Sequence, residues 1–457
     1  MKILLVEPDY PNKYPPLGLL KIGAYHQQRG DEVVLYKGLL KGEAAQYFDR
    51  IYITTLFSFY YSKTIATILH YKRMVGGNLR RLYVGGIYAT LYPQKIYAAT
   101  GIYPFTGQLN RPGILGDDKV IVDQLAPAYV LLDSVNYDYA LKDAYFGYAT
   151  RGCPNTCAFC AVPKLEPKFI DYIDIKPFVN AVREKYGEKS HLVLMDNNVL
   201  ASKRFEKIIA DIKKLGFARG AKLQRRQRTV DFNQGLDASL VTTHNAALLA
   251  EICIKPVRLA YDGVRDAAGF ERAIKRLSKA GLKGFSTYVL YNFYDTPADL
   301  YFRLDHTTRL SEEIGCQIYS FPMRYTPLDA IDRLHVGKNW TMRRIRGLQK
   351  ILNYAKGVVS SRRDLFFAAF GKSADEFEEI IHMPDEYILQ RNAHKGNGAS
   401  EWRRDYRKLT AGQRQTLWDV LADNKMDKIK EVWESTKDKR LKRLLQHHID
   451  YPMGAGA

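Results

Sequence analysis

The chain has 457 residues, 46% apolar and 26% charged, a balance typical of globular proteins with room for about three domains. Since no apolar run approaches the ~20 residues that span a bilayer, and the apolar stretch at the N-terminus is too short for a secretion signal, we expect a cytoplasmic protein with no membrane partner. Five unevenly placed cysteines argue against a disulfide framework. The net charge of +20 makes nucleic acid a candidate partner, with a merely basic solvated surface as the alternative.

Residues 1–125 are predicted to form a Rossmann-like α/β domain. Short apolar strands at 2–6, 32–36, 50–55 and 81–84 alternate with apolar-periodic helices at 17–29 and 64–73. This order implies parallel strands joined by helical crossovers. Gly85 and Gly86, which follow the last strand, would let the backbone approach a ligand or a neighbouring segment closely.

Two motifs of this domain, Tyr14-Pro-Pro-Leu-Gly-Leu-Leu and Val84-Gly-Gly-Ile-Tyr-Ala-Thr, look like those of the cobalamin-binding-type Rossmann domain. The resemblance implies this fold and, as one option, bound cobalamin. The chain departs from the classical pattern because it has no D-x-H-x-x-G, the motif whose histidine ligates cobalt. Cobalamin binding without that histidine and a purely structural or substrate-binding domain therefore both stay open.

Downstream of a predicted linker at 126–144, a second α/β domain is expected at 145–328. Helical stretches separate six predicted strands, which lie at 145–150, 191–196, 229–235, 257–262, 285–291 and 317–321. Strand–helix units at this spacing indicate a parallel β/α barrel or part of one, and in such barrels the chemistry lies at the carboxyl ends of the strands. Residues 329–457 are predicted to be a mainly helical domain with a disordered tail at 452–457.

Three cysteines in the loop after the first barrel strand form the most informative motif. Cys153, Cys157 and Cys160 have the spacing C-x₃-C-x₂-C. Three thiolates this close can ligate three irons of a 4Fe–4S cluster and leave the fourth iron open. A structural zinc site is the alternative, but such sites take four ligands and no second cysteine pair lies nearby. The solitary Cys253 and Cys316 are interpreted as small core residues.

This spacing, with the aromatic Phe159 before the third cysteine, is the signature of the radical S-adenosylmethionine (radical SAM) enzymes, which the chain resembles over roughly residues 1–325. The resemblance implies a partial (β/α)₆ barrel, a 4Fe–4S cluster, S-adenosylmethionine (SAM) on the open iron and a reductant such as flavodoxin or ferredoxin. In this family a 5′-deoxyadenosyl radical takes a hydrogen atom from the substrate. Methyl transfer, rearrangement and sulfur insertion all use this core, so the reaction, the substrate and the catalytic residues are not assigned.

The ends of the other predicted strands supply polar residues that we expect to contact SAM or the substrate. Each of them has a plainer alternative as a cap of the helix that follows its strand. With the aromatic residue of the motif, the predicted cofactor-binding residues are Phe159, Asp196, Asn197, Gln234, Asp237, Asp262 and Asn292.

The positive charge is concentrated at residues 201–230, which hold ten Lys/Arg against two Asp/Glu. Lys222, Arg225, Arg226 and Arg228 precede the third barrel strand, at the end opposite the expected active site. They would either line a path for phosphates or form a plain solvated face. The sequence alone favours the solvated face. The alternative function from another class is a non-catalytic nucleic-acid-binding protein with a structural metal centre.

Overall fold

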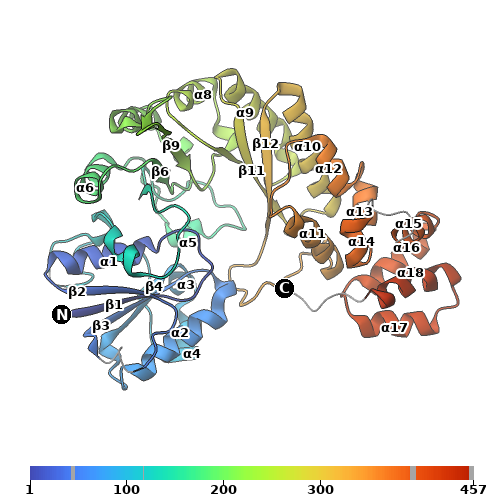
Figure 1. Ribbon diagram of the computed structural model, residues 1–457, viewed down its shortest axis with the longest axis horizontal. Coiled ribbons are helices and arrows are strands. Elements are labelled where there is room, and N and C mark those ends of the chain that lie inside the picture. Colours follow the sequence, from blue (N-terminus) through green and yellow to red (C-terminus); the bar gives the residue numbers. More distant parts are fainter. Residues whose placement is uncertain (43–46, 117, 392–397, 452–457) are drawn as a thin grey trace. The chain divides into compact units, whose positions relative to one another are not determined.

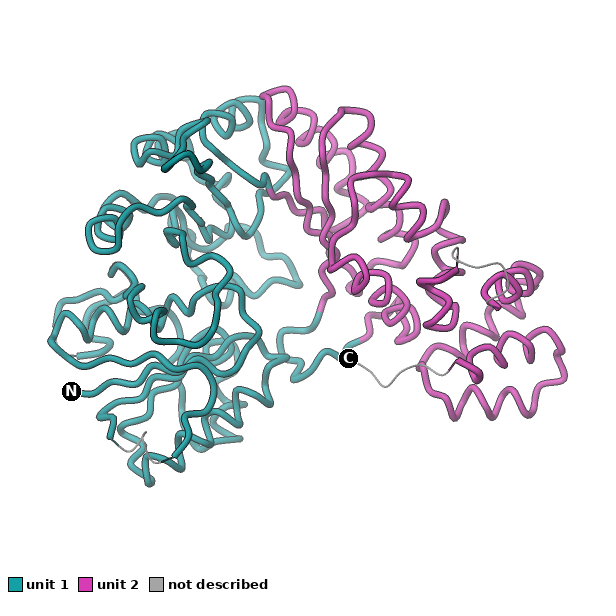
Figure 2. The backbone as a smooth tube through the Cα atoms, viewed as in Figure 1, with its two compact units in different colours: residues 1–257, 326–335 teal, residues 258–325, 336–457 magenta. Residues whose placement is uncertain are grey.

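The computed structural model describes residues 1–42, 47–116, 118–391 and 398–451. The chain forms two compact units (Figure 2). Unit 1 comprises residues 1–257 and 326–335, and unit 2 comprises residues 258–325 and 336–457. The tail predicted at 452–457 lies outside the described residues. In the part of the chain that is described, no helix is long and apolar enough to cross a membrane.

Unit 1 begins with the predicted α/β fold. Four parallel strands form a sheet in the order β2-β1-β3-β4. The strands are β1 (Lys2–Glu7), β2 (Glu32–Lys37), β3 (Arg50–Thr55) and β4 (Leu82–Gly86). The helices are α1 (Leu17–Gln28), α2 (Tyr61–Met74), α3 (Ile87–Leu91) and α4 (Pro93–Thr100). The Rossmann-like alternation expected from the sequence is therefore confirmed.

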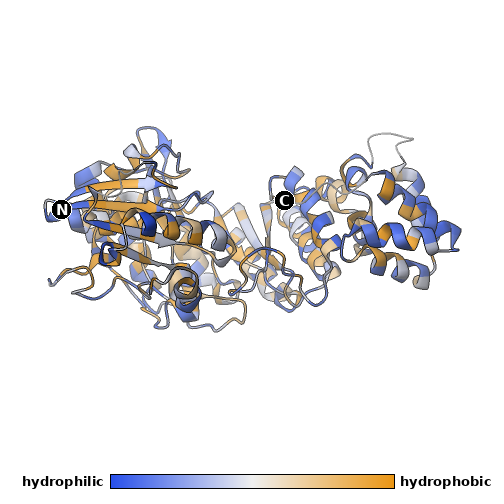
Figure 3. Cartoon of the chain, turned by 90° about the horizontal axis from the view of Figure 1, so that it is seen from below, coloured by the Kyte–Doolittle hydropathy of each residue, from blue (hydrophilic) through white to orange (hydrophobic). Residues whose placement is uncertain are grey.

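Strand β1 is apolar on both sides because helices cover both faces of this sheet (Figure 1). Ile3 and Leu5 pack in one cluster with Leu20 of α1, whereas Leu4 and Val6 pack in a second cluster with residues of α2 and α4. Figure 3 shows the same pattern as apolar colour concentrated on the strands. Burying each such side chain stabilises the fold by about 1.5–3 kcal/mol.

The glycines at the end of β4 are explained by a neighbouring strand. Gly86 has φ +107°, and a Cβ there would lie 2.4 Å from the carbonyl oxygen of Thr55 in β3. The Thr55 hydroxyl also donates to the Gly85 carbonyl at 2.9 Å. Of the two uses that the sequence allowed for this pair, close approach to a neighbouring segment is the one that the structure shows.

A second parallel sheet in unit 1 has the order β5-β6-β9. Its strands are β5 (Ala144–Gly147), β6 (His191–Leu194) and β9 (Thr229–Phe232). The helices between these strands are α5 (Val162–Leu165), α6 (Lys176–Tyr186) and α7 (Phe205–Ile212). A π-helical turn at Lys213–Phe217 and the short strands β7 (Lys222–Leu223) and β8 (Arg226–Gln227) come before β9, and α8 (Thr243–Ala250) follows it. The predicted linker contains a 3-10 helix at Tyr129–Ser134, whose Leu131 packs into the core of the first sheet.

Unit 2 carries the last three predicted strands and the helical C-terminal region. The sheet β10-β11-β12 consists of β10 (Val257–Ala260), β11 (Gly284–Tyr291) and β12 (Gln317–Arg324), with helices α9 (Ala267–Lys279) and α10 (Pro297–Ile314). All six predicted strands are therefore present, as two three-stranded sheets, and their closure into one barrel stays a prediction.

The mainly helical character predicted after residue 329 is confirmed from residue 342 onward. The helices are α11 (Met342–Tyr354), α12 (Arg363–Phe370), α13 (Ala374–His382), α14 (Asp385–Gln390), α15 (Ala399–Arg407), α16 (Ala411–Leu421), α17 (Met426–Ser435) and α18 (Lys439–Asp450). They share one apolar core with α10, which includes Trp402 and Phe377.

Candidate functional site at the cysteine loop

The backbone of the cysteine loop is fixed where it leaves β5. Arg151 and Ile170 exchange two backbone hydrogen bonds, at 3.1 and 2.8 Å, so the chain returns beside its own starting point. Gly152 has φ +73°, and a Cβ there would lie 2.6 Å from the Lys168 carbonyl oxygen. A glycine is therefore required at this position by both its φ and its crowding.

The three cysteines of the motif lie on this loop as thiols. Cys153 and Cys160 are half-buried and Cys157 is exposed. Backbone N–H groups approach two of the sulfurs, that of Asn155 at 3.4 Å from Cys153 Sγ and that of Val162 at 3.5 Å from Cys160 Sγ. These hydrogen bonds orient the two sulfurs on the loop. Within the described residues, no three His, Cys, Asp or Glu side chains are gathered into a ready metal-binding group.

Asp196, which follows β6, holds the segment that leads into the loop. Its carboxylate accepts hydrogen bonds from the Ala149 N–H at 3.0 Å, from the Thr150 N–H, and from the Thr150 hydroxyl at 2.7 Å. The side chain is buried, and this burial raises the pKa of Asp196 to about 6. The structure therefore gives Asp196 a role in shaping the loop, and its predicted contact with SAM stays a prediction.

Glu166 performs a similar role on the other side of the loop. Its carboxylate accepts from the Gly152 N–H at 2.7 Å and from the Asn197 side-chain amide at 2.7 Å. It also forms an ion pair with Arg151 at 2.9 Å, and Arg151 in turn lies over the ring of Tyr148. Glu166 is a site residue that the predicted set did not include. Its hydrogen bond holds the predicted Asn197 beside the loop.

Asn198 joins the cysteine loop to the end of β9. Its side-chain amide donates to Asp237 at 3.3 Å and lies 3.6 Å from Cys153 Sγ, and Asn155 donates to the same Asp237 carboxylate at 3.1 Å. The side-chain oxygen of Asn198, Oδ1, is buried and has no hydrogen-bond partner in the described structure. Buried acceptors are usually hydrogen-bonded in folded proteins, so this oxygen is open to a ligand or an ordered water. The predicted Asp237 is thus brought to the cysteines, and Asn198 is a site residue that the predicted set did not include.

Gln234 and Phe159 occupy the margin of the same region. Gln234 is exposed and donates to Asn233 at 3.2 Å, and Asn233 donates to the hydroxyl of Tyr14 at 2.6 Å. Phe159 is half-buried on the cysteine loop itself. The structure therefore places both residues near the strand ends that the sequence indicated, and their contact with a cofactor stays a prediction.

Asp262 and Asn292 belong to unit 2 and lie after β10 and β11. Asn292 is buried with φ +68°, donates to the Tyr325 carbonyl at 3.0 Å and accepts from the Gly337 N–H at 2.8 Å. Its side chain therefore joins two backbone segments. The predicted cofactor contact of Asn292 is neither supported nor excluded by these bonds.

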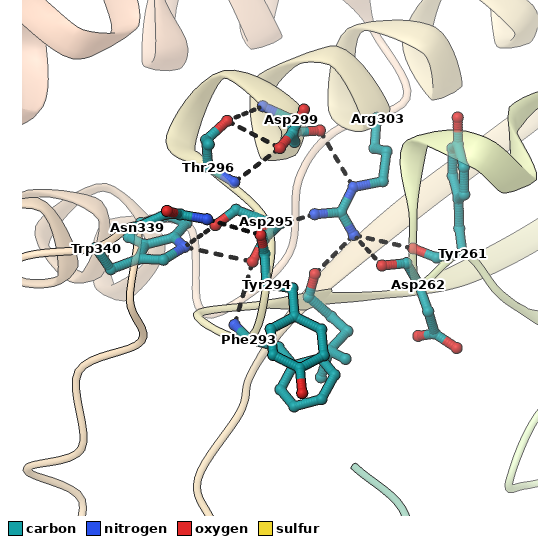
Figure 4. Close-up of polar contacts among 11 residues, drawn as sticks. Tyr261, Asp262, Phe293, Tyr294, Asp295, Thr296, Asp299, Arg303, Asn339 and Trp340 are labelled. Carbon is teal, nitrogen blue, oxygen red and sulfur yellow. Dashed lines mark hydrogen bonds and ion pairs between the residues drawn. The ribbon is translucent and has the colours of Figure 1, made fainter. Parts of the chain in front are cut away.

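Arg303, which is fully buried, ties together the strand ends that carry these residues (Figure 4). Its guanidinium donates to the carbonyl oxygens of Tyr261, Asp262 and Leu290 at 3.2, 3.0 and 2.6 Å, and pairs with Asp295 at 2.7 Å. Figure 4 shows the carboxylate of Asp262 turned away from Arg303, so only its backbone takes part in this clamp.

No protein-family model matches the chain, and no curated protein matches it in sequence. The chemistry of the donor set, three thiols on one loop beside a buried acceptor without a partner, fits an iron–sulfur cluster with a bound small molecule.

The Rossmann-like sheet has one place where cobalamin would be expected to bind. Ligands of such sheets bind at the carboxyl ends of the strands where the strand order reverses, here between β1 and β3. In this place the rings of Tyr10 and Tyr60 stack with centroids 4.9 Å apart, and buried Tyr10 is hydrogen-bonded to Thr64 at 2.5 Å. These residues as they stand do not fit cobalamin, and we assign no step to it.

Proposed function

We propose that the chain is a radical SAM enzyme in which Cys153, Cys157 and Cys160 hold a 4Fe–4S cluster and SAM binds at its open iron. When bound, the cluster would supply an electron and SAM a sulfonium that one electron cleaves, which is the chemistry for removing a hydrogen atom from a substrate. The reductant is a flavodoxin- or ferredoxin-type protein. The substrate is unidentified, and the proposed cellular setting is the cytoplasm.

The observation that carries the proposal is the cysteine loop and its place in the fold. The loop follows the carboxyl end of β5 in a parallel sheet, where β/α proteins place their chemistry. The six strands found at the predicted positions support the finer assignment, a partial (β/α)₆ barrel after a cobalamin-binding-type Rossmann domain.

The residues around the loop have distinct tasks in this proposal. Asp196 and Glu166 fix the backbone on either side of Gly152, so that the sulfurs leave a defined segment. The backbone N–H groups of Asn155 and Val162 donate to the sulfurs of Cys153 and Cys160 and orient them. In this proposal the side-chain oxygen Oδ1 of Asn198 accepts a hydrogen bond from an amino or hydroxyl group bound next to Cys153.

The second candidate is a non-catalytic nucleic-acid-binding protein with a structural metal centre. Only the exposed basic residues described in the next subsection favour it. Structural zinc sites have four protein ligands, and the sequence has no second cysteine pair near this loop.

The test is anaerobic reconstitution of the full chain with iron and sulfide, followed by metal analysis. We expect about four irons and four sulfides per chain, with a brown colour. A colourless protein that retains one zinc per chain and no iron would contradict the proposal and favour the second candidate.

A further inference from the structure

The segment 213–228, between α7 and β9, is the most basic part of the chain. It holds seven Lys/Arg and no Asp/Glu in sixteen residues. It comprises the π-helical turn, a short connection and the hairpin of β7 and β8. A solvated protein face usually mixes both signs of charge. The function of this segment therefore depends on which of its cations already have partners inside the protein.

Two of the seven cations are engaged in the fold. Lys213 pairs with Glu251 at 2.6 Å, and Arg228 forms an ion pair with Glu188 and lies over the ring of Phe217. Arg228 is buried, so it does not belong to the phosphate path that the sequence suggested. It holds the base of the hairpin instead.

The side chains of the other five cations are exposed, and within the described residues none of them forms an ion pair or a side-chain hydrogen bond. They are Lys214, Arg219, Lys222, Arg225 and Arg226.

The hairpin that carries three of these cations has an uncommon turn. β7 and β8 pair antiparallel, with Lys222 opposite Gln227, and Gln224 and Arg225 form the two-residue loop. Both loop residues have positive φ, +44° and +71°. Such loops strongly favour Asn-Gly, because other residues pay a steric cost there. The tip of the hairpin therefore carries a guanidinium at a position where an unstrained turn would have glycine.

We propose that the β7–β8 hairpin, with Lys214 and Arg219 beside it, is a binding surface for the phosphate backbone of a nucleic acid. Three of the five cations are arginines, which match phosphate oxygens with two parallel hydrogen bonds. A two-stranded ribbon also has the shape that enters a groove of a duplex. The tip is polar, whereas segments that insert into a membrane surface present large apolar side chains.

The position of the hairpin separates this surface from the cysteine loop. The hairpin precedes β9, and the cysteine loop follows β5 in the same parallel sheet. The hairpin therefore lies at the amino ends of the strands and the loop at their carboxyl ends. The strands between them are four residues long, or about 13 Å at the usual rise. The surface therefore binds a polymer without touching the cluster, and its test is independent of the proposed enzyme activity.

The test uses the full chain and fluorescently labelled 30-nucleotide RNA, with a DNA duplex of matched length as the second probe, read by anisotropy between 50 and 200 mM salt. For single strands, five contacts give a log–log slope of affinity against salt of about −3.5, since each contributes about −0.7. Replacing Lys222, Arg225 and Arg226 by Ala should reduce the slope by about 2 and weaken binding at least about tenfold at the lower salt.

The matched control removes the same charge elsewhere, by replacing Lys430, Lys437 and Lys439 by Ala. These lysines are exposed and unpaired in the described structure. The control should bind as the unmutated chain does. Equal losses of affinity in both triple variants would show attraction by net charge alone and overturn the proposal. The absence of salt-sensitive nucleic-acid binding by the unmutated chain would also overturn it. The same holds if the unmutated chain binds only phosphatidylserine vesicles.

A second variant separates charge from folding. Gln224→Asn with Arg225→Gly gives the turn its favoured sequence and removes the tip guanidinium. It should unfold no more easily than the unmutated chain and still bind RNA more weakly, with a slope reduced by about 0.7. Unchanged affinity and slope would overturn the role of the tip.

Discussion

The charged residues at the two ends of the parallel strands β5, β6 and β9 differ in burial and in partners. At the carboxyl end, Asp196 and Glu166 are largely buried, and backbone N–H groups, side chains and an arginine satisfy their oxygens. At the amino end, Arg225 and Arg226 are exposed and meet no acidic side chain in the described residues. A buried charge that is fully hydrogen-bonded shapes a site, whereas an exposed unpaired charge is available for binding. In this account the buried carboxylates position the cysteines, and the exposed arginines anchor a partner.

The largest expected effect is loss of the cluster when one thiolate is removed. Cys157→Ala leaves two thiolates for three irons, so iron after anaerobic desalting should fall to a small fraction of the unmutated value. Cys253→Ala is the matched control, because Cys253 is buried in unit 1 and burial raises the pKa of its thiol to about 11. Full iron content in Cys157→Ala, or iron loss in Cys253→Ala, would show that the ligands are misassigned.

The next effect concerns the carboxylate that holds the loop. Asp196→Ala leaves two buried N–H groups and one hydroxyl without an acceptor, and each unsatisfied group costs about 1–3 kcal/mol. We expect the free energy of unfolding to fall by about 3 kcal/mol. Urea unfolding measures this loss, and hydrogen exchange over residues 144–152 should locate it.

The control for this prediction is Asp196→Asn, which keeps one acceptor oxygen and should lose less stability than Asp196→Ala. If exchange near the loop is unchanged in Asp196→Ala, the carboxylate does not hold the loop.

A third prediction tests whether buried polar groups also matter in the helical region of unit 2. Burial, with a smaller contribution from nearby arginines, lowers the pKa of His382 to about 3. An unfolded histidine has a pKa near 6.5, so between about pH 6.5 and 3 the unfolded chain binds the extra proton and stability falls as the pH falls. This one group contributes about 1.4 kcal/mol per pH unit in that window.

His382→Asn should therefore make the free energy of unfolding less steep between pH 6 and 4, by up to about that slope. All four tryptophans lie between residues 340 and 433, so their fluorescence follows this region alone. His244→Gln is the control, because His244 is exposed. Equal slopes in the two variants would show that His382 takes up its proton in the folded state.

The smallest effect belongs to the hairpin turn. Gln224→Asn with Arg225→Gly relieves two positive-φ residues of their steric cost, so we expect a gain in stability of up to about 1 kcal/mol. Thermal unfolding measures the gain. A loss of stability would mean that the two side chains support the folded hairpin. This result would weaken the contrast between the carboxyl and the amino ends of the strands.

The sequence was sufficient for elements whose pattern is local. β3 spans the residues predicted for it, since its apolar residues fit a strand buried between helices. β5 ends at Gly147 rather than at the predicted residue 150, because the carboxylate of Asp196 takes the N–H groups of Ala149 and Thr150 out of the ladder. That capture joins residues 46 and 47 positions apart, which no local pattern reveals.

The candidate site was predictable only in part for the same reason. The cysteine spacing is a local signal, and the strand ends drew attention to Asn197 and Asp237. Glu166 lies beside the loop only because the chain returns through Ile170, so its role depends on the fold. The unsatisfied oxygen of Asn198 could likewise be recognised only from burial.

Reductive cleavage of SAM tests the central claim most directly. The reconstituted chain is incubated anaerobically with SAM and dithionite, and 5′-deoxyadenosine and methionine are quantified. We predict that both products form with the unmutated chain and with Cys253→Ala, and that neither forms with Cys157→Ala or without dithionite. A fully iron-loaded, reduced chain that leaves SAM intact would contradict the account.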